Sequence, residues 1–200
     1  MTDGLPPDVF EDSRSRLPLP ERDHLPPAAQ EIFDRHADPE GGTLAGLRGP
    51  GGIKLHSPGY SVHAFSQLEY LRHRTGISPH IRELAILITA REHDSRFEWS
   101  KHEPEGLHQG LSQETIDAVK HRGPVDGLPD LEATVITFGR QLFRNHRVEP
   151  NVYAAALEGL GRQRLVDLVA LMGTYAATAA LLTAFDAQVP DEETYLLPMP

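Results

Sequence analysis

The sequence predicts an all-α fold, and three observations point to that class. Apolar residues recur at helical spacing along most of the chain, whereas no segment shows sustained period-two alternation with β-branched residues. Proline follows serine at Ser57-Pro58 and at Ser78-Pro79, as a first helical position follows its cap. Glycine closes apolar runs at Gly76 and Gly110. We therefore expect a single-domain helical bundle.

Composition and charge narrow the class of protein further. The 200 residues are 39% hydrophobic and 24% charged, which suits one domain with a substantial core. With 29 acidic and 19 basic residues the formal charge is −10, so neither nucleic acid nor an anionic membrane surface is an expected partner. No charge-free run of 18 apolar residues and no apolar signal-peptide core are found, so we expect a cytoplasmic protein.

Metal and thiol chemistry have little support in the sequence. The chain has no cysteine, which excludes disulfides, thiol catalysis, iron–sulfur clusters and cysteine-based zinc sites. Among the 11 histidines there is no His-Glu-x-x-His motif, because Gly106 stands where the second ligand is needed. His56, His63 and His73 have spacings compatible with one helix face, yet no third ligand accompanies either pair. We predict no metal site.

Three segments are expected along the chain. Residues 1–25, rich in proline and charged residues, are expected to form an extended arm that lies on the surface or crosses to a neighbouring subunit. Residues 26–190 are expected to form the helical domain, and residues 191–200 a C-terminal tail. The glycine-rich segment 39–52 is expected to be a loop. It is not a phosphate-cradling loop, because no Gly-Lys-Ser/Thr follows it.

The helices follow from their start signals and apolar periods. Expected helical segments are 26–38, 58–74, 79–92, 95–110, 113–121, 130–146, 150–160 and 162–187. Small residues in the last segment, such as Gly173 and Ala177, let neighbouring helices approach closely. Arg164 and Asp167 near its start favour a buried bundle helix over a membrane span. Arg72-His73-Arg74 is expected on a solvated face.

The stretch from Arg82 to Gly110 organises the rest of the chain. Its apolar run ends in polar residues, which predicts a helix break near His93–Ser95. Beyond the break, Ser95, Glu98 and His102 share one helix face at roughly 100° per residue. A carboxylate and an imidazole four residues apart can exchange a hydrogen bond or a proton. The alternative is structural, since Ser95-x-x-Glu98 is also a capping box and a Glu–His pair is often a surface contact.

The ordered residues of this stretch also resemble a known family. Arg82-Glu83-Leu84-Ala85-Ile86-Leu87, Phe97-Glu98-Trp99, His102 and Gly110-Leu111-Ser112 resemble the carboxymuconolactone decarboxylase family, whose superfamily includes the alkylhydroperoxidase D-like peroxidases. The resemblance covers roughly residues 25–190. It implies an all-α homotrimer or hexamer that works without a metal or an organic cofactor.

The peroxidase branch of that superfamily uses the pattern Glu-x11-Cys-x2-Cys-x3-His. Counted from Glu83, the two cysteine positions are occupied by Ser95 and Glu98, and the histidine position by His102. Disulfide cycling needs two sulfurs, so cysteine-dependent peroxidase activity is disfavoured. The chain is similar instead to the decarboxylase-like branch, which lacks the Cys-x-x-Cys pair.

We expect a cofactor-independent acid–base enzyme acting on a small oxygenated or carboxylated molecule, such as a lactone or keto acid. Decarboxylation, isomerisation and elimination are the candidate reactions. His102 is assigned as proton donor or acceptor, with Glu98 as its partner and Glu83 as the carboxylate that orients the imidazole. The expected substrate-binding residues are Trp99 as an apolar wall, Tyr175 as a hydrogen-bond donor, Ser95 and His56.

A non-catalytic helical oligomer that retains the fold is the alternative function. Ser95 and Glu98 would then form a plain helix cap, and Glu103-Pro104-Glu105 could block the site. A redox-sensing or regulatory partner is a third possibility, but it has no thiol to work with. A functional pair needs a pocket and partial burial, whereas a cap needs neither.

Overall fold

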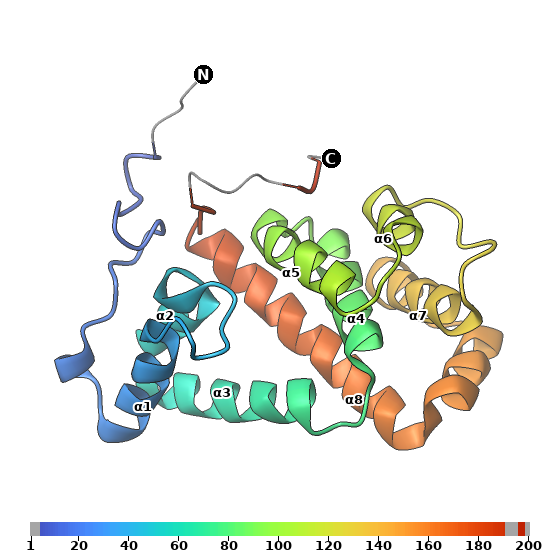
Figure 1. Ribbon diagram of the computed structural model, residues 1–200, viewed down its shortest axis with the longest axis horizontal. Helices are drawn as coiled ribbons and strands as arrows, with labels where there is room; N and C mark the ends of the chain where they lie inside the picture. Colours follow the sequence, from blue (N-terminus) through green and yellow to red (C-terminus); the bar gives the residue numbers. More distant parts are fainter. Residues whose placement is uncertain (1–4, 191–195, 199–200) are drawn as a thin grey trace. The chain divides into compact units, whose positions relative to one another are not determined.

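The computed structural model describes residues 5–190 and 196–198, and these residues are largely helical. The α-helices are α1 (Pro27–Ala37), α2 (Pro50–Leu55), α3 (Pro58–His73), α4 (Pro79–Glu92), α5 (Arg96–His108), α6 (Gln113–Lys120), α7 (Asp130–Arg140) and α8 (Pro150–Ala184) (Figure 1). Short 3-10 helices occur at η1 (Arg22–His24) and η2 (Gly46–Arg48), and η3 (Gln141–Asn145) is π-helical. The described residues form no sheet, only one isolated bridge between Phe10 and Ser15. The all-α prediction is confirmed.

Contacts divide the chain into two compact units. The first holds the described residues of 1–69 and 180–194, and the second those of 70–179 and 195–200. Both α3 and α8 contribute residues to each unit. This division does not coincide with the predicted boundaries of the N-terminal arm, at residues 25/26, and of the C-terminal tail, at residues 190/191. Those boundaries remain a prediction.

In the first unit, the N-terminal arm is bonded to the C-terminal end of α8 in the same chain. The amide of Arg16 donates to the carbonyl of Phe185 at 2.8 Å, and the amide of Gln188 donates to the carbonyl of Arg14 at 2.8 Å. Arg14 Nε also donates to the carbonyl of Val189 at 3.1 Å. The arm therefore lies on its own chain, which agrees with the first of the two alternatives, an arm on the protein surface. A crossing to a neighbouring subunit stays a prediction.

The glycine-rich segment 39–52 contains helix, so the prediction of a plain loop was wrong there. Residues of η2 and the first turn of α2 fall within it. A Cβ at Gly52 would lie 1.9 Å from the carbonyl oxygen of Leu47, and one at Gly51 would lie 2.1 Å from the His36 ring. These glycines allow close packing around the small core of Ala29, Ile32 and Leu55 rather than loop formation.

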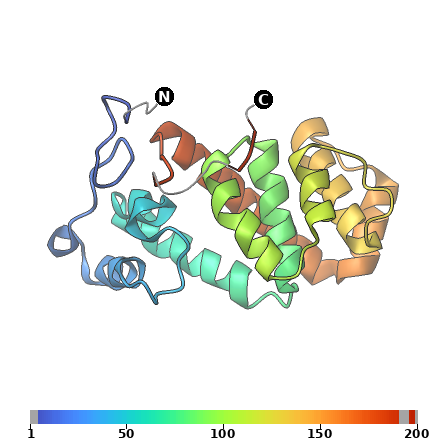
Figure 2. The same ribbon diagram turned by 45° about the horizontal axis from the view of Figure 1, so that its top comes forward.

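In the second unit, α4 is the central helix and contacts α5, α6 and α7 (Figure 2). From Glu83 to Arg91 every residue of α4 is buried. Glycines on two neighbours make this packing possible. A Cβ at Gly139 of α7 would lie 2.6 Å from Ile88 Cγ2, and one at Gly106 of α5 would lie 3.3 Å from Leu87 Cδ1. The stretch that organises the sequence is thus also the core of the second unit.

The predicted break between α4 and α5 is confirmed, with α4 ending at Glu92 and α5 beginning at Arg96. Asp94 adopts a left-handed conformation with φ of 49°, which turns the chain between the two helices. Arg91 Nη1 donates to the Asp94 carboxylate, and Arg122 Nη2 donates to the carbonyl of Arg91 at 3.0 Å and to Asp94 at 3.4 Å. Arginines from two parts of the chain therefore hold the corner.

The predicted capping box at this corner is not formed. Ser95 is the N-cap of α5 by position, but its side chain makes no capping hydrogen bond. The ψ angle of Ser95 is 88°. Ser112, the N-cap of α6, has a ψ angle of 152°, and its Oγ accepts a hydrogen bond from the amide of Thr115 at 3.1 Å. The backbone at Ser95 therefore lacks the extended geometry of a side-chain cap. The prediction that Ser112 caps α6 is confirmed.

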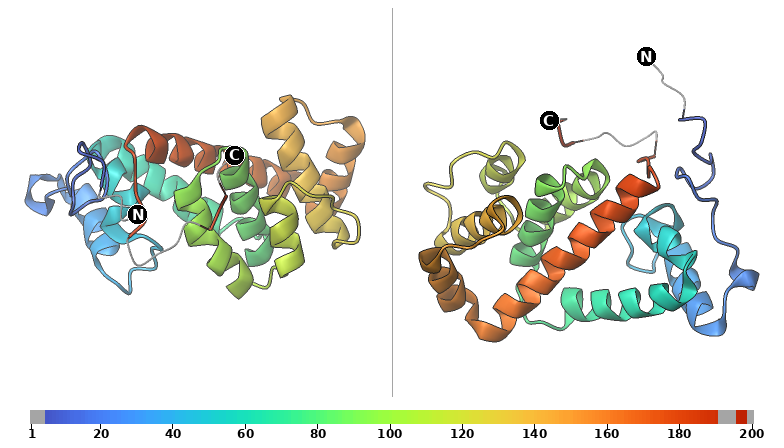
Figure 3. Two further views of the ribbon diagram at one scale, coloured as in Figure 1. Left: turned by 90° about the horizontal axis from the view of Figure 1, so that it is seen from above. Right: turned by 180° about the vertical axis from the view of Figure 1, so that it is seen from behind.

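The last helix is broken at Gly161, as predicted, and the bend is visible from behind the molecule (Figure 3, right). Gly161 has φ of 75° and ψ of 163°, a conformation that is essentially restricted to glycine. The helix ends at Ala184 rather than at 187. By length and composition alone α8 could cross a membrane, but half of its most apolar window is buried within the protein. Burial of that kind is also typical of a core helix.

Candidate functional site

A buried carboxylate–imidazole pair joins α4 to α5. Glu83 of α4 is completely buried and His102 of α5 is 6% exposed. His102 Nδ1 and Glu83 Oε2 are 2.7 Å apart, which is a short hydrogen bond. Gly106 lies one turn beyond His102, and its missing Cβ lets α5 approach the side of α4 that carries Glu83. Tertiary packing, not local spacing, therefore creates the pair.

Two arginines complete the surroundings of the Glu83 carboxylate. Arg82 Nε donates to Oε1 at 3.2 Å, and Arg72 Nη2 lies 3.7 Å from the same oxygen. Burial is the largest influence on the pKa of Glu83 and raises it. The hydrogen bond and charge of His102, with the charges of Arg72 and Arg82, outweigh burial and leave the pKa below its ordinary value. Glu83 is therefore a carboxylate at neutral pH.

The ionised state of Glu83 determines which nitrogen of His102 carries the proton. A carboxylate only accepts hydrogen bonds, so we assign the imidazole proton to Nδ1, which donates to Glu83. In the neutral form of the ring, Nε2 is then the basic nitrogen. When that nitrogen takes up a proton, the adjacent carboxylate stabilises the imidazolium. The pair thus has the arrangement of a general base, the His102 imidazole, and a carboxylate, that of Glu83, which orients it.

Tyr175 of α8 lies against the imidazole of His102. The two ring centroids are 5.3 Å apart and the planes meet at 84°, an edge-to-face contact. Burial is the main cause that raises the pKa of the Tyr175 phenol, and the negative charges of Glu83 and Glu98 raise it further against the opposing charges of Arg72 and Arg82. The phenol therefore remains protonated over the physiological range and can donate a hydrogen bond.

The two carboxylates expected near His102 have different standing. Glu83 was expected to orient the imidazole, and its Oε2 lies 2.7 Å from Nδ1. Glu98 was expected to pair with the imidazole because it precedes it by four residues, and that pairing stays a prediction. Glu98 is 3% exposed and its charge acts on the Tyr175 phenol, so it lies within the same buried group. Spacing on one helix thus identified the face that carries Glu98 and His102, whereas the role of Glu83 came from the family resemblance.

Three other predicted site residues have different surroundings. Trp99 is fully buried, its Nε1 donates to Glu103, and Lys120 Nζ lies 6.0 Å from the indole centroid and 3.1 Å from the Glu103 carboxylate. Ser95 is buried at the helix corner. His56 belongs to the first unit, where its Nε2 is 2.8 Å from the carbonyl oxygen of Pro18. Substrate contacts of these three residues stay predictions.

Glu103 belongs to the segment Glu103-Pro104-Glu105, which in the alternative function could block the site around His102. Its carboxylate is directed to Trp99 and Lys120 rather than to His102.

Arg72 and Arg82 were missed as site residues. Arg72 was assigned to a solvated basic face, since nothing local to Arg72-His73-Arg74 indicates that α3 ends beside Glu83. Arg82 precedes Glu83 directly, and that adjacency was the available signal.

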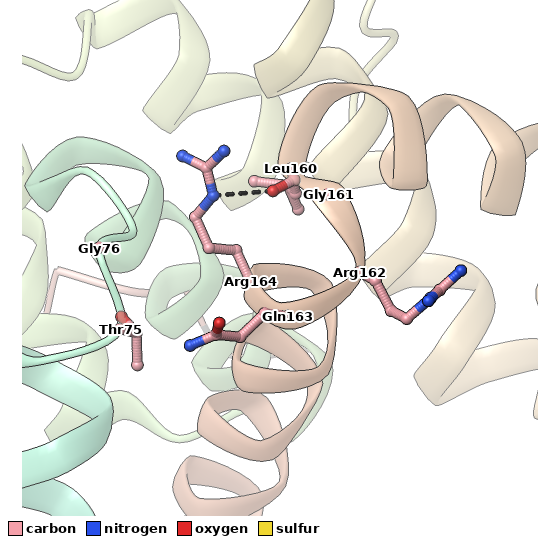
Figure 4. Close-up of a pocket in the computed structure, with 7 residues that line it drawn as sticks. All are labelled: Thr75, Gly76, Leu160, Gly161, Arg162, Gln163 and Arg164. Carbon is pink, nitrogen blue, oxygen red and sulfur yellow. Dashed lines mark hydrogen bonds between the residues drawn. The ribbon is translucent and has the colours of Figure 1, made fainter.

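A separate pocket of about 430 Å³ lies at the break in α8 (Figure 4). Its lining residues are Thr75, Gly76, Leu160, Gly161, Arg162, Gln163 and Arg164. Arg164 Nε is held by the carbonyl of Leu160 at 2.7 Å, and the Arg162 side chain points away from the other labelled side chains (Figure 4). None of the predicted site residues lines this pocket.

Among the described residues, no group of three or more His, Asp or Glu could hold a metal ion.

The fold is that of the alkylhydroperoxidase AhpD-like proteins. A crystal structure of the AhpD core, an uncharacterised peroxidase-related protein from Ralstonia eutropha JMP134, matches with a TM-score of 0.72 and 16% identity, over 90% of this chain and 94% of that one. A protein of unknown function from Agrobacterium tumefaciens, described as a candidate antioxidant defence protein AhpD, matches with a TM-score of 0.61 and 16% identity, over 70% of this chain and 96% of that one.

Comparison at the level of sequence adds nothing to this assignment, because no family model and no curated protein matches. The two structural likenesses therefore establish the AhpD-like fold that the family resemblance implied. They carry no statement about the reaction, the substrate or the oligomeric state.

Proposed function

We propose that the protein is a cofactor-independent acid–base enzyme of the carboxymuconolactone decarboxylase-like kind, acting on a small oxygenated or carboxylated molecule. The observation that carries the proposal is the buried hydrogen bond of 2.7 Å between His102 Nδ1 and Glu83. It supplies an oriented imidazole whose second nitrogen is basic, beside a neutral phenol. The family resemblance of the same residues supports the proposal.

In the proposed reaction, His102 Nε2 removes a proton from a carbon next to a carbonyl group. Glu83 stabilises the imidazolium that forms, and Tyr175 donates a hydrogen bond to the carbonyl oxygen as its negative charge grows. Isomerisation or elimination then returns the proton at another atom. In decarboxylation the carboxylate leaves as CO₂, and the carbanion that remains takes the Nε2 proton of His102, which enters this route as the imidazolium and leaves it neutral. Each route uses one proton and needs no redox partner.

The alternative proposal is a helical oligomer in which this group serves packing alone. It is supported by the burial of the whole group, since Glu83, Glu98, His102 and Tyr175 are each at most 6% exposed. A fully satisfied polar network can fix a unique core without any chemistry. The alternative predicts that changes to these residues reduce stability and affect no reaction. The homotrimer or hexamer implied by the resemblance fits either proposal.

Proton exchange tests the two proposals directly. Small keto acids and lactones are incubated with the protein in D₂O, and loss of the signal of the protons next to the carbonyl is followed by ¹H NMR. His102→Gln should lower the exchange rate by at least about 10²-fold, because general base catalysis contributes about 10²–10⁴-fold. The matched control is His108→Gln, an exposed histidine on the same helix, which should keep the wild-type rate. Equal rates in wild type and His102→Gln would contradict the enzymatic proposal.

A further inference from the structure

Arg72 lies at the edge of the candidate site, in the last turn of α3. Its Nη2 is 3.7 Å from Glu83 Oε1, and the other oxygen of that carboxylate holds His102. His102 in turn contacts the ring of Tyr175. Arg72, Glu83, His102 and Tyr175 are therefore successive neighbours. The positive charge of Arg72 also lowers the pKa of the Tyr175 phenol, against the effect of burial, as expected for a guanidinium close to it.

The two arginines of the group differ in their contacts. Arg82 donates from Nε to Glu83 at 3.2 Å and from Nη1 to the backbone carbonyl of Arg72 at 2.7 Å, and its side chain is 11% exposed. Arg72 stands farther from the carboxylate and its side chain is 17% exposed, the largest value in the group. Glu83 keeps Arg82 and His102 as hydrogen-bond donors if Arg72 turns towards a ligand. Arg72 is therefore the member of the group with the most surface open to solvent.

We propose that Arg72 binds the carboxylate of the substrate, so that the site selects small oxo-carboxylic acids over neutral carbonyl compounds. This inference rests on the proposed function for the position of the reacting atoms. A guanidinium binds a carboxylate through two parallel hydrogen bonds, which fixes both its place and its orientation. Held there, the substrate presents its carbonyl oxygen to Tyr175 and the adjacent carbon to His102.

Levulinate and its methyl ester make a matched pair of probes, since they differ in the charge of one end and share the same ketone. Binding of each to the full chain at pH 7 is measured by NMR titration. Wild type should bind levulinate about 10- to 100-fold more tightly than the ester, the range expected for one hydrogen-bonded charge pair. Arg72→Gln should remove that difference, and Arg74→Gln, at an exposed arginine just beyond α3, should keep it.

The inference is overturned if wild type binds the two probes equally, binds neither, or if Arg72→Gln binds levulinate as wild type does. Thermal melts show whether Arg72→Gln is folded. If it is not, Arg72→Lys serves instead, because it keeps the charge and loses the paired contact. Affinity for levulinate should then fall, and unchanged affinity overturns the inference.

The outcomes for Arg72 and for the proposed reaction are separable. His102→Gln should lose proton exchange and still bind levulinate. Binding that depends on Arg72, without any exchange in wild type, would remove the proposed function alone. Exchange that depends on His102, with equal rates for levulinate and its ester, would remove the inference about Arg72 alone.

Discussion

Replacing Glu83 by glutamine tests whether the buried carboxylate carries the charge assigned to it. The change keeps the volume and one acceptor for His102, but removes the negative charge that faces Arg82 and Arg72. Breaking a buried ion pair from one side typically costs about 3–5 kcal/mol. Because glutamine still accepts a hydrogen bond, we expect the lower end, a loss of about 3 kcal/mol in the free energy of unfolding at pH 7.

The pH dependence of that loss follows from the pKa of Glu83, which lies below its ordinary value of 4.5 in the folded protein. A carboxyl group with a lowered folded-state pKa contributes stability above its unfolded pKa, and loses it as the pH falls towards the folded one. The contribution of the Glu83 charge to the stability gap between wild type and Glu83→Gln should therefore be fully present at about pH 5.5 and above. Below about pH 4.5 the gap should narrow.

Urea unfolding of both proteins between pH 3.5 and 8 measures the gap, because effects of acid on the rest of the chain cancel in the difference. The control is Glu158→Gln, at an exposed residue of α8, for which the gap should stay near zero throughout. A gap for Glu83→Gln that persists unchanged from about pH 4.5 to 3.5, or grows over that range, would refute the assignment of a charged carboxylate.

Two further predictions concern packing and caps. Ser112→Ala should cost about 1 kcal/mol of stability, because its Oγ accepts an amide of α6, whereas Ser95→Ala should cost clearly less by the same urea assay, because that side chain makes no capping bond. Gly139→Ala should destabilise by about 1–2 kcal/mol, since its Cβ would lie 2.6 Å from Ile88 Cγ2 in the core, while Gly173→Ala, with nothing within 4 Å, should stabilise by about 0.5–1 kcal/mol through helix propensity. A stabilising effect of Gly139→Ala, or equal effects at the two glycines, would show that the close approach of α7 to Ile88 on α4 is not limiting.

The sequence predicted those features of the fold that depend on neighbours along the chain. The break near His93–Ser95, the cap at Ser112 and the kink at Gly161 were all predicted correctly, because each arises from a few adjacent residues with a strong preference. The helix within 39–52 was missed because its glycines serve close packing against Leu47 and His36, a tertiary property.

The candidate site was predicted less completely, for a related reason. His102 and Glu83 were both identified, with Glu83 expected to orient the imidazole because of the family resemblance. Spacing within one helix favoured Glu98 as the direct partner, and that pairing stays a prediction. The carboxylate that is bonded to Nδ1 comes from a helix 19 residues earlier in the chain. Arg72, which lies 3.7 Å from that carboxylate, was assigned to solvent because only contacts within one helix can be counted from spacing.

The corner between α4 and α5 acts as a pivot for the chemistry. His102 lies seven residues beyond Ser95, so α5 forms an arm of about 10 Å between the turn and the imidazole. A rotation of α5 by about 10° about that turn would move the imidazole by about 2 Å. That displacement is several times the margin of about 0.5 Å over which an N–H···O hydrogen bond of 2.7 Å keeps a normal length. Arg91 and Arg122, which both donate to Asp94, therefore help to set the alignment of the Glu83–His102 hydrogen bond, which neither of them touches.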